Sequence, residues 1–123
     1  MTGSPLRAIA AVRLGLGLGA WLMPRLGGRL FGLDPRGNPQ VPYIARLFGA
    51  RDVALAAGAL LSEDEPRRLW LQAGLGCDVA DTAAGLAAGL RGYLGPVSAA
   101  LVTGAAVGAG ALSVAALRAE EAE

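Results

Sequence analysis

Four long apolar segments, separated by shorter polar ones, dominate the pattern along the chain. They cover residues 6–23, 42–61, 69–90 and 96–117. Because an α-helix rises about 1.5 Å per residue, about 20 residues cross the roughly 30 Å hydrocarbon core of a bilayer. The pattern therefore predicts a single all-α domain over residues 1–123: an antiparallel, integral membrane four-helix bundle with short loops.

Prolines and interfacial aromatic residues mark the ends of these segments. Proline is tolerated in the first turn of a helix, and Trp and Tyr favour the membrane–water interface. The prolines near segment ends are Pro5, Pro24, Pro42, Pro66 and Pro96. The aromatic residues at the same borders are Trp21, Tyr43, Trp70 and Tyr93. Two independent signals thus indicate the same helix boundaries.

The polar connections carry weaker signals. Residues 24–40 are rich in Gly, Pro and Arg, which fits either a segment along the headgroup surface or a solvated loop. Ser62, with Glu65 three residues later, predicts a capping box before the third segment. The arginines flanking the segments are divided equally between the two sides, so the positive-inside rule does not orient the chain. We expect a multi-pass protein of the cell inner membrane with both termini on one side.

Composition supports a membrane protein and excludes several functions. The apolar fraction is 54% and the mean hydropathy is +0.47. The core of a soluble protein of 123 residues could not bury this much apolar surface. The 11 basic residues, all Arg, nearly balance the 10 acidic ones, so we predict no nucleic-acid partner. Cys77 is the only cysteine and there is no histidine, which excludes an internal disulfide, a His-based triad and His metal sites. We predict no metal and no cofactor.

Charged residues interrupt the first three apolar segments within the membrane, most of them near its middle. They are Arg13, Arg46, Arg51, Asp52, Asp78 and Asp81. One unpaired charge at the bilayer centre costs about 2.5–3.5 kcal/mol, so six would cost about 15 kcal/mol or more. We therefore expect ion pairs between helices, formed by Arg13 or Arg51 with Asp78 and Asp81.

Residue spacing predicts which helix faces carry these charges. In the third segment one face holds Gly74, Asp78, Asp81, Gly85 and Ala88, and another holds Leu75, Val79, Leu86 and Leu90. Small residues favour helix contacts and large apolar ones suit lipid, so the aspartate face should turn inward. In the first segment, Arg13 shares its face with small residues at positions 10, 17 and 20.

The remaining charges differ in their expected partners. Arg51 and Asp52 are adjacent and point about 100° apart on a helix, so they should not pair with each other. Arg46 points in another direction one turn from the interface, where its side chain would extend toward the headgroups.

Glycines at regular spacing predict helix contacts. Gly15, Gly17 and Gly19 do not have the GxGxxG spacing of a nucleotide site, and they fit a packing face better. Gly104 and Gly108 form a small-xxx-small pair on the uncharged fourth segment. That segment either completes the bundle or forms a homo-oligomer contact, and Cys77 fits a packing role.

Two motifs contain most of the buried charge. Residues 46–52 read Arg-Leu-Phe-Gly-Ala-Arg-Asp, an RxFGxRD motif, and residues 78–81 form DxxD. With these motifs the chain resembles a family of small four-helix actinobacterial integral membrane proteins of unknown function. The resemblance covers most of the chain and implies a four-helix inner-membrane fold without assigning an activity. The shared centre that it implies is Arg46, Gly49, Arg51, Asp52, Asp78 and Asp81.

Several functions are compatible with charge at this depth. The first is a non-enzymatic component that binds a membrane lipid, another apolar ligand or partner helices through the six charged residues. The second is a membrane-embedded acid/base enzyme of the isomerase, cyclase or epoxide-opening type, acting on an apolar substrate such as an isoprenoid. Its candidate catalytic residues are Asp52, Asp78 and Asp81. The third is a proton- or ion-coupled transport element.

A purely structural salt-bridge network is an equally good explanation of these charges. Ion pairs sealed inside the bundle, without a cavity that reaches Asp78 and Asp81, would exclude the enzyme and transport hypotheses together.

Overall fold

The computed structural model describes residues 3–122, and within them it contains five α-helices and no strand. The helices are α1 (Gly3–Leu22), α2 (Pro24–Leu30), α3 (Val41–Leu61), α4 (Asp64–Leu90) and α5 (Pro96–Glu121). The predicted all-α class is confirmed, and each long helix overlaps one predicted apolar segment, although α4 begins five residues earlier and α5 ends four residues later than predicted. The short helix α2 was not predicted. It lies within residues 24–40, for which the sequence allowed either a segment along the headgroup surface or a solvated loop.

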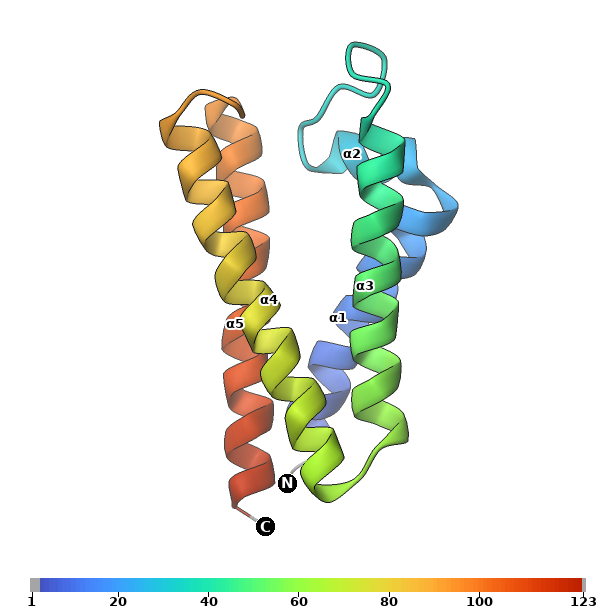
Figure 1. Ribbon diagram of the computed structural model, residues 1–123, viewed down its shortest axis with the longest axis vertical. Helices are drawn as coiled ribbons and strands as arrows, with labels where there is room; N and C mark the ends of the chain where they lie inside the picture. The colour runs from blue at the N-terminus through green and yellow to red at the C-terminus, as the bar shows by residue number, and fades with distance from the viewer. Residues whose placement is uncertain (1–2, 123) are drawn as a thin grey trace.

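The four long helices form two antiparallel pairs, α1 with α3 and α4 with α5 (Figure 1). The pairs meet at the end of the molecule where both chain termini lie, and they separate toward the other end (Figure 1). We call these the closed end and the open end. Helix α2 and the loop after it lie at the open end, where α2 packs against α1 and α3.

Each helix has a proline in its first turn, where a missing N–H removes no intrahelical hydrogen bond. The start of α4 nevertheless differs from the prediction. Its N-cap is Glu63, which makes no capping hydrogen bond through its side chain, and Asp64 has a positive φ of 54°. The predicted capping box of Ser62 and Glu65 is therefore wrong, because the helix begins one residue later than that motif requires.

The hydrophobic core lies toward the closed end. All four long helices contribute to it, with Leu6, Ile9, Ala59, Leu71 and Ala116 as the buried cluster. These residues come from the start of α1 and α4 and from the end of α3 and α5, which are the parts that meet at the closed end. The core thus joins the two helix pairs at one end only.

Helices α1 and α3 approach closely at a pair of glycines. A Cβ added to Gly17 would lie 2.8 Å from the carbonyl oxygen of Gly49, and a Cβ on Gly49 would lie 2.5 Å from that of Gly17. Side chains at these positions would force the backbones apart, so the small residues set the spacing of the pair.

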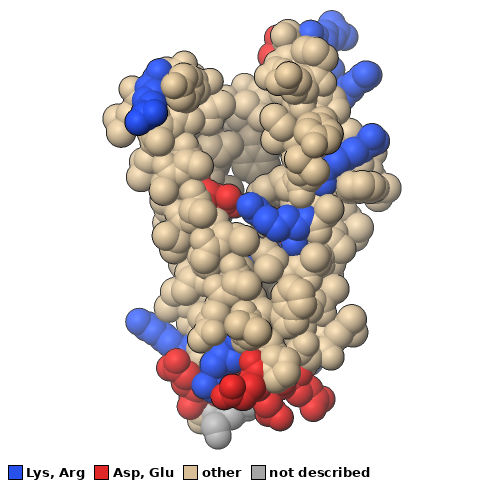
Figure 2. Space-filling view, viewed as in Figure 1, with Lys and Arg blue, Asp and Glu red and all other residues tan. Residues whose placement is uncertain are grey.

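Among the described residues, two helical stretches are long and apolar enough to cross a membrane, Ser4–Leu22 and Pro96–Glu121. The other two long helices, α3 and α4, carry most of the charged residues that interrupt the apolar segments. Their outer faces are nevertheless apolar, with exposed large side chains at Leu47, Leu61, Leu69, Val79, Leu86 and Leu90. In Figure 2, acidic side chains gather mainly at the closed end. Above it the surface is mostly uncharged, apart from basic side chains toward the open end and an acidic and a basic group side by side at mid-height.

Candidate functional site: a charge cluster at the base of an apolar cavity

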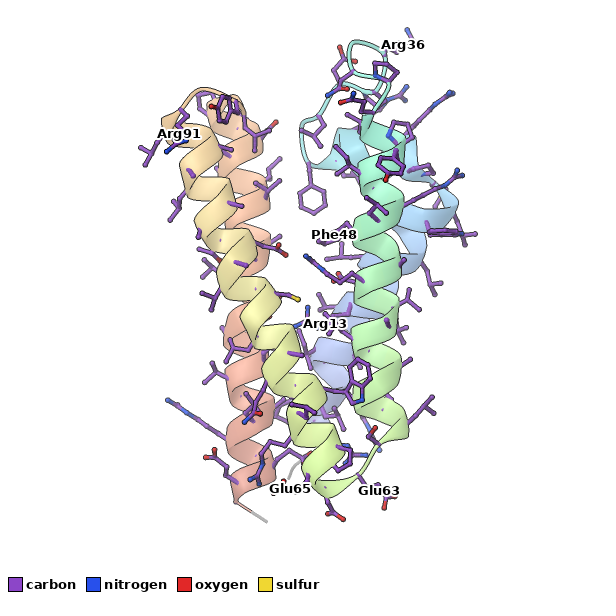
Figure 3. All side chains as sticks on the ribbon, viewed as in Figure 1. Arg13, Arg36, Phe48, Glu63, Glu65 and Arg91 are labelled. Carbon is purple, nitrogen blue, oxygen red and sulfur yellow. The ribbon has the colours of Figure 1, made fainter. Side chains whose placement is uncertain are left out.

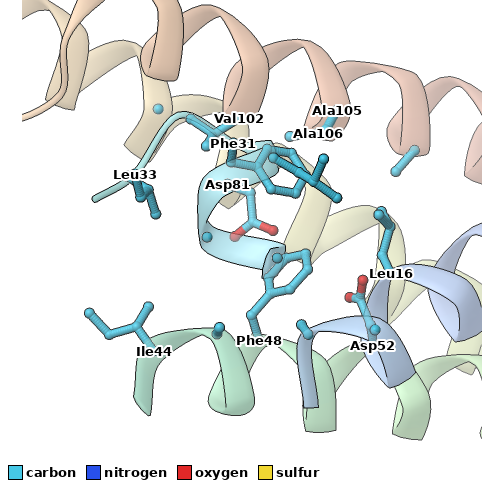
Figure 4. A pocket seen from close by; sticks show the side chains of 18 of the residues that line it. Leu16, Phe31, Leu33, Ile44, Phe48, Asp52, Asp81, Val102, Ala105 and Ala106 are labelled. Carbon is cyan, nitrogen blue, oxygen red and sulfur yellow. The ribbon is translucent and has the colours of Figure 1, made fainter. Parts of the chain in front are cut away.

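A cavity of about 560 Å³ lies between the two helix pairs toward the open end. Its walls are mainly apolar and include Leu16 of α1, Phe48 of α3, Val102 of α5 and Phe31 of the loop after α2. Figure 4 shows the two phenylalanine rings projecting into this space, and Figure 2 shows the surface hollowed between the helix pairs. The volume lies within the range of about 300–1,000 Å³ that is typical of small-molecule sites.

Two glycines of α1 form part of the cavity wall. Gly15 and Gly19 both line the cavity, and a Cβ added to either would meet nothing within 4 Å. The predicted packing face is therefore correct for Gly17, which contacts α3, and wrong for Gly15 and Gly19. The missing side chains at these two positions leave room for the cavity.

Arg13 and Asp78 form a buried ion pair between α1 and α4 at the base of the cavity. The two guanidinium nitrogens lie 3.1 and 2.8 Å from the two carboxylate oxygens, a bidentate arrangement. Their side chains are 6% and 4% exposed. The close approach requires a small neighbour, because a Cβ on Gly74 would lie 2.6 Å from Nη2 of Arg13. This pair is one of those predicted from the sequence.

Ser113 of α5 completes the environment of this pair, and the sequence interpretation did not include it in the site. Its hydroxyl accepts a hydrogen bond from Arg13 Nη2 at 3.1 Å and lies 3.0 Å from Asp78 Oδ2. The carbonyl of Ala109, at 2.9 Å, is the other acceptor for its single proton. A signal existed: Ser113 lies seven residues after Ala106 and three before Ala116, on one face of small, buried residues.

Arg51 of α3 and Asp81 of α4 form the second ion pair. The guanidinium is again bidentate, with Nη1 at 3.1 Å from Oδ1 and Nη2 at 2.5 Å from Oδ2. This pair is more open than the first, because the side chains are 35% and 32% exposed. The guanidinium also lies 5.0 Å from the ring centroid of Phe48, within cation–π distance. This pair, too, was predicted.

Asp52 of α3 differs from the other two aspartates. It is 3% exposed and lines the cavity, and among the described residues its carboxylate receives no hydrogen bond. Arg13 Nη1 and Arg51 Nε each lie 3.9 Å from Oδ1, close enough for electrostatic attraction and too far for a hydrogen bond. Arg51 and Asp52 were expected not to pair with each other. No hydrogen bond joins them, but their contact at 3.9 Å is a long ion pair.

Arg46 does not join the other charged residues. It is exposed on α3, donates a hydrogen bond from Nε to the Trp21 carbonyl at 3.2 Å, and lies 5.8 Å from the Trp21 ring centroid. Of the six charged residues predicted for the site, Arg46 therefore lies apart from the other five, on a different face of α3 and against the end of α1. We define the charge cluster as Arg13, Arg51, Asp52, Asp78 and Asp81.

The predicted faces of α4 and α1 agree with the structure. On α4, Gly74, Asp78 and Gly85 are buried, whereas Val79 and Leu86 are exposed. On α1, the face that carries Arg13 is buried at positions 10, 13, 17 and 20. Leu75, predicted to face outward, is only half-buried.

Both ion pairs connect α4 to the other helix pair. Figure 3 shows Arg13 and Phe48 in the space between the pairs, with Arg36 and Arg91 at the open end and Glu63 and Glu65 at the closed end. The charge cluster therefore lies between the hydrophobic core below and the cavity above. Its two arginines and three aspartates leave one negative charge.

Two other predicted features stay outside the site. Gly104 and Gly108 of α5 are exposed, and a Cβ on either would meet nothing within 4 Å in the described part of the chain. Cys77 is a half-buried free thiol. In the described residues no group of three or more Cys, Asp or Glu side chains is arranged to hold a metal ion.

No family model, curated protein or solved structure matches this chain. The chemistry of the site is therefore derived from its own geometry: an apolar, partly open space that ends on a buried group of charged side chains.

Proposed function

We propose that this chain is a multi-pass inner-membrane protein of four spanning helices that binds one amphiphilic ligand in its cavity. The ligand's apolar body lies between the helix pairs and its polar end lies at the charge cluster. The observation that carries this proposal is that the apolar cavity of about 560 Å³ ends on three buried or half-buried aspartates and one arginine.

The distribution of polarity supports a membrane environment. Helices α1 and α5 meet the length and apolarity of membrane spans, and α3 and α4 expose large apolar side chains on their outer faces. Soluble monomers rarely expose apolar patches larger than a few hundred Å². The charge-cluster residues of α3 and α4 are turned inward, and Arg51, Asp78 and Asp81 are paired, as the cost of charge in lipid requires. We further propose, from the two sequence motifs alone, that the chain belongs to the family of small membrane proteins described above.

A ligand explains the site better than a purely structural network does. Ion pairs that only fix helix packing would be expected to be enclosed by side chains, as close packing of interiors demands. Here the charge cluster borders open space, and Gly15 and Gly19 widen that space instead of filling it. Ligand pockets typically combine apolar walls with a few convergent polar groups.

The enzyme and transport hypotheses receive less support. General acid/base catalysis needs a carboxyl group that is free to exchange a proton with the substrate. Asp78 and Asp81 are each held by a bidentate arginine, which leaves Asp52 as the one aspartate of the cluster without a hydrogen bond from the described residues. Proton transport by relay would require further titratable side chains along the cavity, whose apolar walls provide few.

Native mass spectrometry of the purified full chain tests this proposal. The test variant is Gly19→Leu, because Gly19 lines the cavity and an added Cβ there would meet nothing within 4 Å. The matched control is Gly104→Leu, an equal change at an exposed glycine away from the cavity. We expect the unchanged chain and the control to retain a lipid-like molecule through detergent washing, and Gly19→Leu to lose it.

Equal retention by Gly19→Leu, or no retained molecule in the unchanged chain, would refute ligand binding in this cavity. The membrane part of the proposal has its own test. After alkaline carbonate washing the chain should stay with the membrane pellet, and its release into the supernatant would contradict four spanning helices.

A further inference from the structure

The charges that line the cavity are strongly unequal. They are Arg13, Asp52, Asp78 and Asp81, so one basic side chain faces three acidic ones. The second arginine of the charge cluster, Arg51, is bound to Asp81 and is outside the lining. None of the arginines at the open end lines the cavity. A ligand that reaches the base of the cavity therefore meets an excess of negative charge.

That excess is located on Asp52. Arg13 is matched by Asp78 at 2.8 Å, and Arg51 is matched by its bidentate contact with Asp81. Asp52 is nine-tenths buried or more and has only two arginine contacts at 3.9 Å, without a hydrogen bond from the described residues. Buried carboxylates normally accept hydrogen bonds, and each exception calls for an explanation such as a missing partner. Figure 4 shows the carboxylates of Asp52 and Asp81 turned toward the same space.

The charge of the ligand decides how well it complements this site. An anionic head would add a second uncompensated negative charge in a medium of low dielectric, where like charges repel strongly. A neutral hydroxyl would supply a hydrogen bond to Asp52 and leave the charge unbalanced. An ammonium head supplies both the hydrogen bond and the counter-charge, so the two arginines, the three aspartates and the ligand sum to zero.

Resting on the proposed function, we propose that the cavity is a site for a cationic amphiphile, an alkyl or polycyclic amine whose ammonium group pairs with Asp52. The apolar body of the amine lies along the cavity wall formed by Leu16, Phe31 and Phe48. The aromatic rings add favourable contacts for a cation that enters between the helix pairs.

Three probes with the same twelve-carbon chain separate the contributions of charge and apolar burial. They are dodecylamine, dodecan-1-ol and dodecanoate, each titrated into the full chain in detergent and quantified by native mass spectrometry. We expect dodecylamine to bind at least about tenfold more tightly than either other probe, a difference of about 1.4 kcal/mol. Asp52→Asn should abolish this preference. The matched control, Asp34→Asn, removes an exposed acidic charge from the loop after α2 and should preserve it.

The outcomes distinguish the two proposals. If Gly19→Leu changes the binding of none of the three probes, the ligand cavity itself is refuted, and the amine site with it. If Gly19→Leu blocks binding while dodecan-1-ol or dodecanoate binds as tightly as dodecylamine, the cavity stands and the amine site is overturned. A preference for dodecylamine that survives in Asp52→Asn also overturns it, because another group then provides the charge. The ranking of probes on the unchanged chain tests the charge preference whether or not Asp52→Asn folds.

Discussion

Removing the Arg13–Asp78 pair from one side and then from both measures how the charge cluster contributes to stability. The perturbations are Arg13→Met, Asp78→Leu and the double variant. The contact is bidentate, at 3.1 and 2.8 Å, with side chains 6% and 4% exposed, so it belongs to the buried class of ion pairs. Removing one partner of a buried pair typically destabilises by about 3–5 kcal/mol, because the other charge stays buried without compensation.

The two single variants should differ in how much stability they lose, because Asp52 is a second partner of Arg13 and not of Asp78. After Asp78→Leu, Arg13 still has Asp52 at 3.9 Å and the Ser113 hydroxyl at 3.1 Å, so we expect a loss near the lower limit, about 3 kcal/mol. After Arg13→Met, Asp52 and Asp78 both lose their shared cation, so the loss should approach about 5 kcal/mol. The double variant removes both charges and should cost less than the sum by about 2–3 kcal/mol.

The chain contains two tryptophans, so unfolding in mixed micelles can be followed by intrinsic fluorescence. Titration with a denaturing detergent gives the free energy of unfolding for each variant and closes the double-mutant cycle. Strict additivity of the two single effects would refute the pair as an energetic unit. A larger loss for Asp78→Leu than for Arg13→Met would refute the role assigned to Asp52.

Three smaller changes test neighbouring parts of the structure with the same unfolding measurement. Arg51→Met should cost about 1 kcal/mol or less, because its pair is one-third exposed; a loss above that of Arg13→Met would contradict this. Gly49→Val should destabilise by about 1–3 kcal/mol through overpacking against α1, whereas Gly104→Val should be neutral; equal effects would refute the close approach. Ser113→Ala should cost about 1 kcal/mol, and no effect would show that its hydrogen bonds are dispensable.

The long helices and the ion pairs were predictable from local pattern. The apolar segments end at prolines, and a proline in the first turn is compatible with a helix start, so boundaries such as Pro42 and Pro96 lie within a residue of the observed ones. The spacing of Asp78 and Asp81 places both on the small-residue face of α4. Because an unpaired charge among apolar side chains costs free energy, these two aspartates could be predicted to pair with the arginines at the same depth.

Helix α2, the cavity and the glycines that line it were not predicted. The cavity depends on how the two helix pairs are placed relative to each other, and the local sequence pattern contains little information about that placement. Helix α2 is seven residues long and includes Gly27 and Gly28, which lower its intrinsic helix propensity. The cavity exists because the pairs separate above the charge cluster. Spacing alone assigned Gly15 and Gly19 to the same role as Gly17, although they belong to different environments.

The ion pairs set where the space between the helix pairs begins. Both lie on α4 within one helical turn of each other, and they join it to α1 and α3. A helix rises about 5.4 Å per turn. Moving the two aspartates and their arginine partners one turn toward the open end would therefore shorten the cavity by about that length. The positions of these four side chains along their helices therefore determine the depth of the cavity. Moving them would adapt the cavity to ligands of a different length while the outer helix faces stay unchanged.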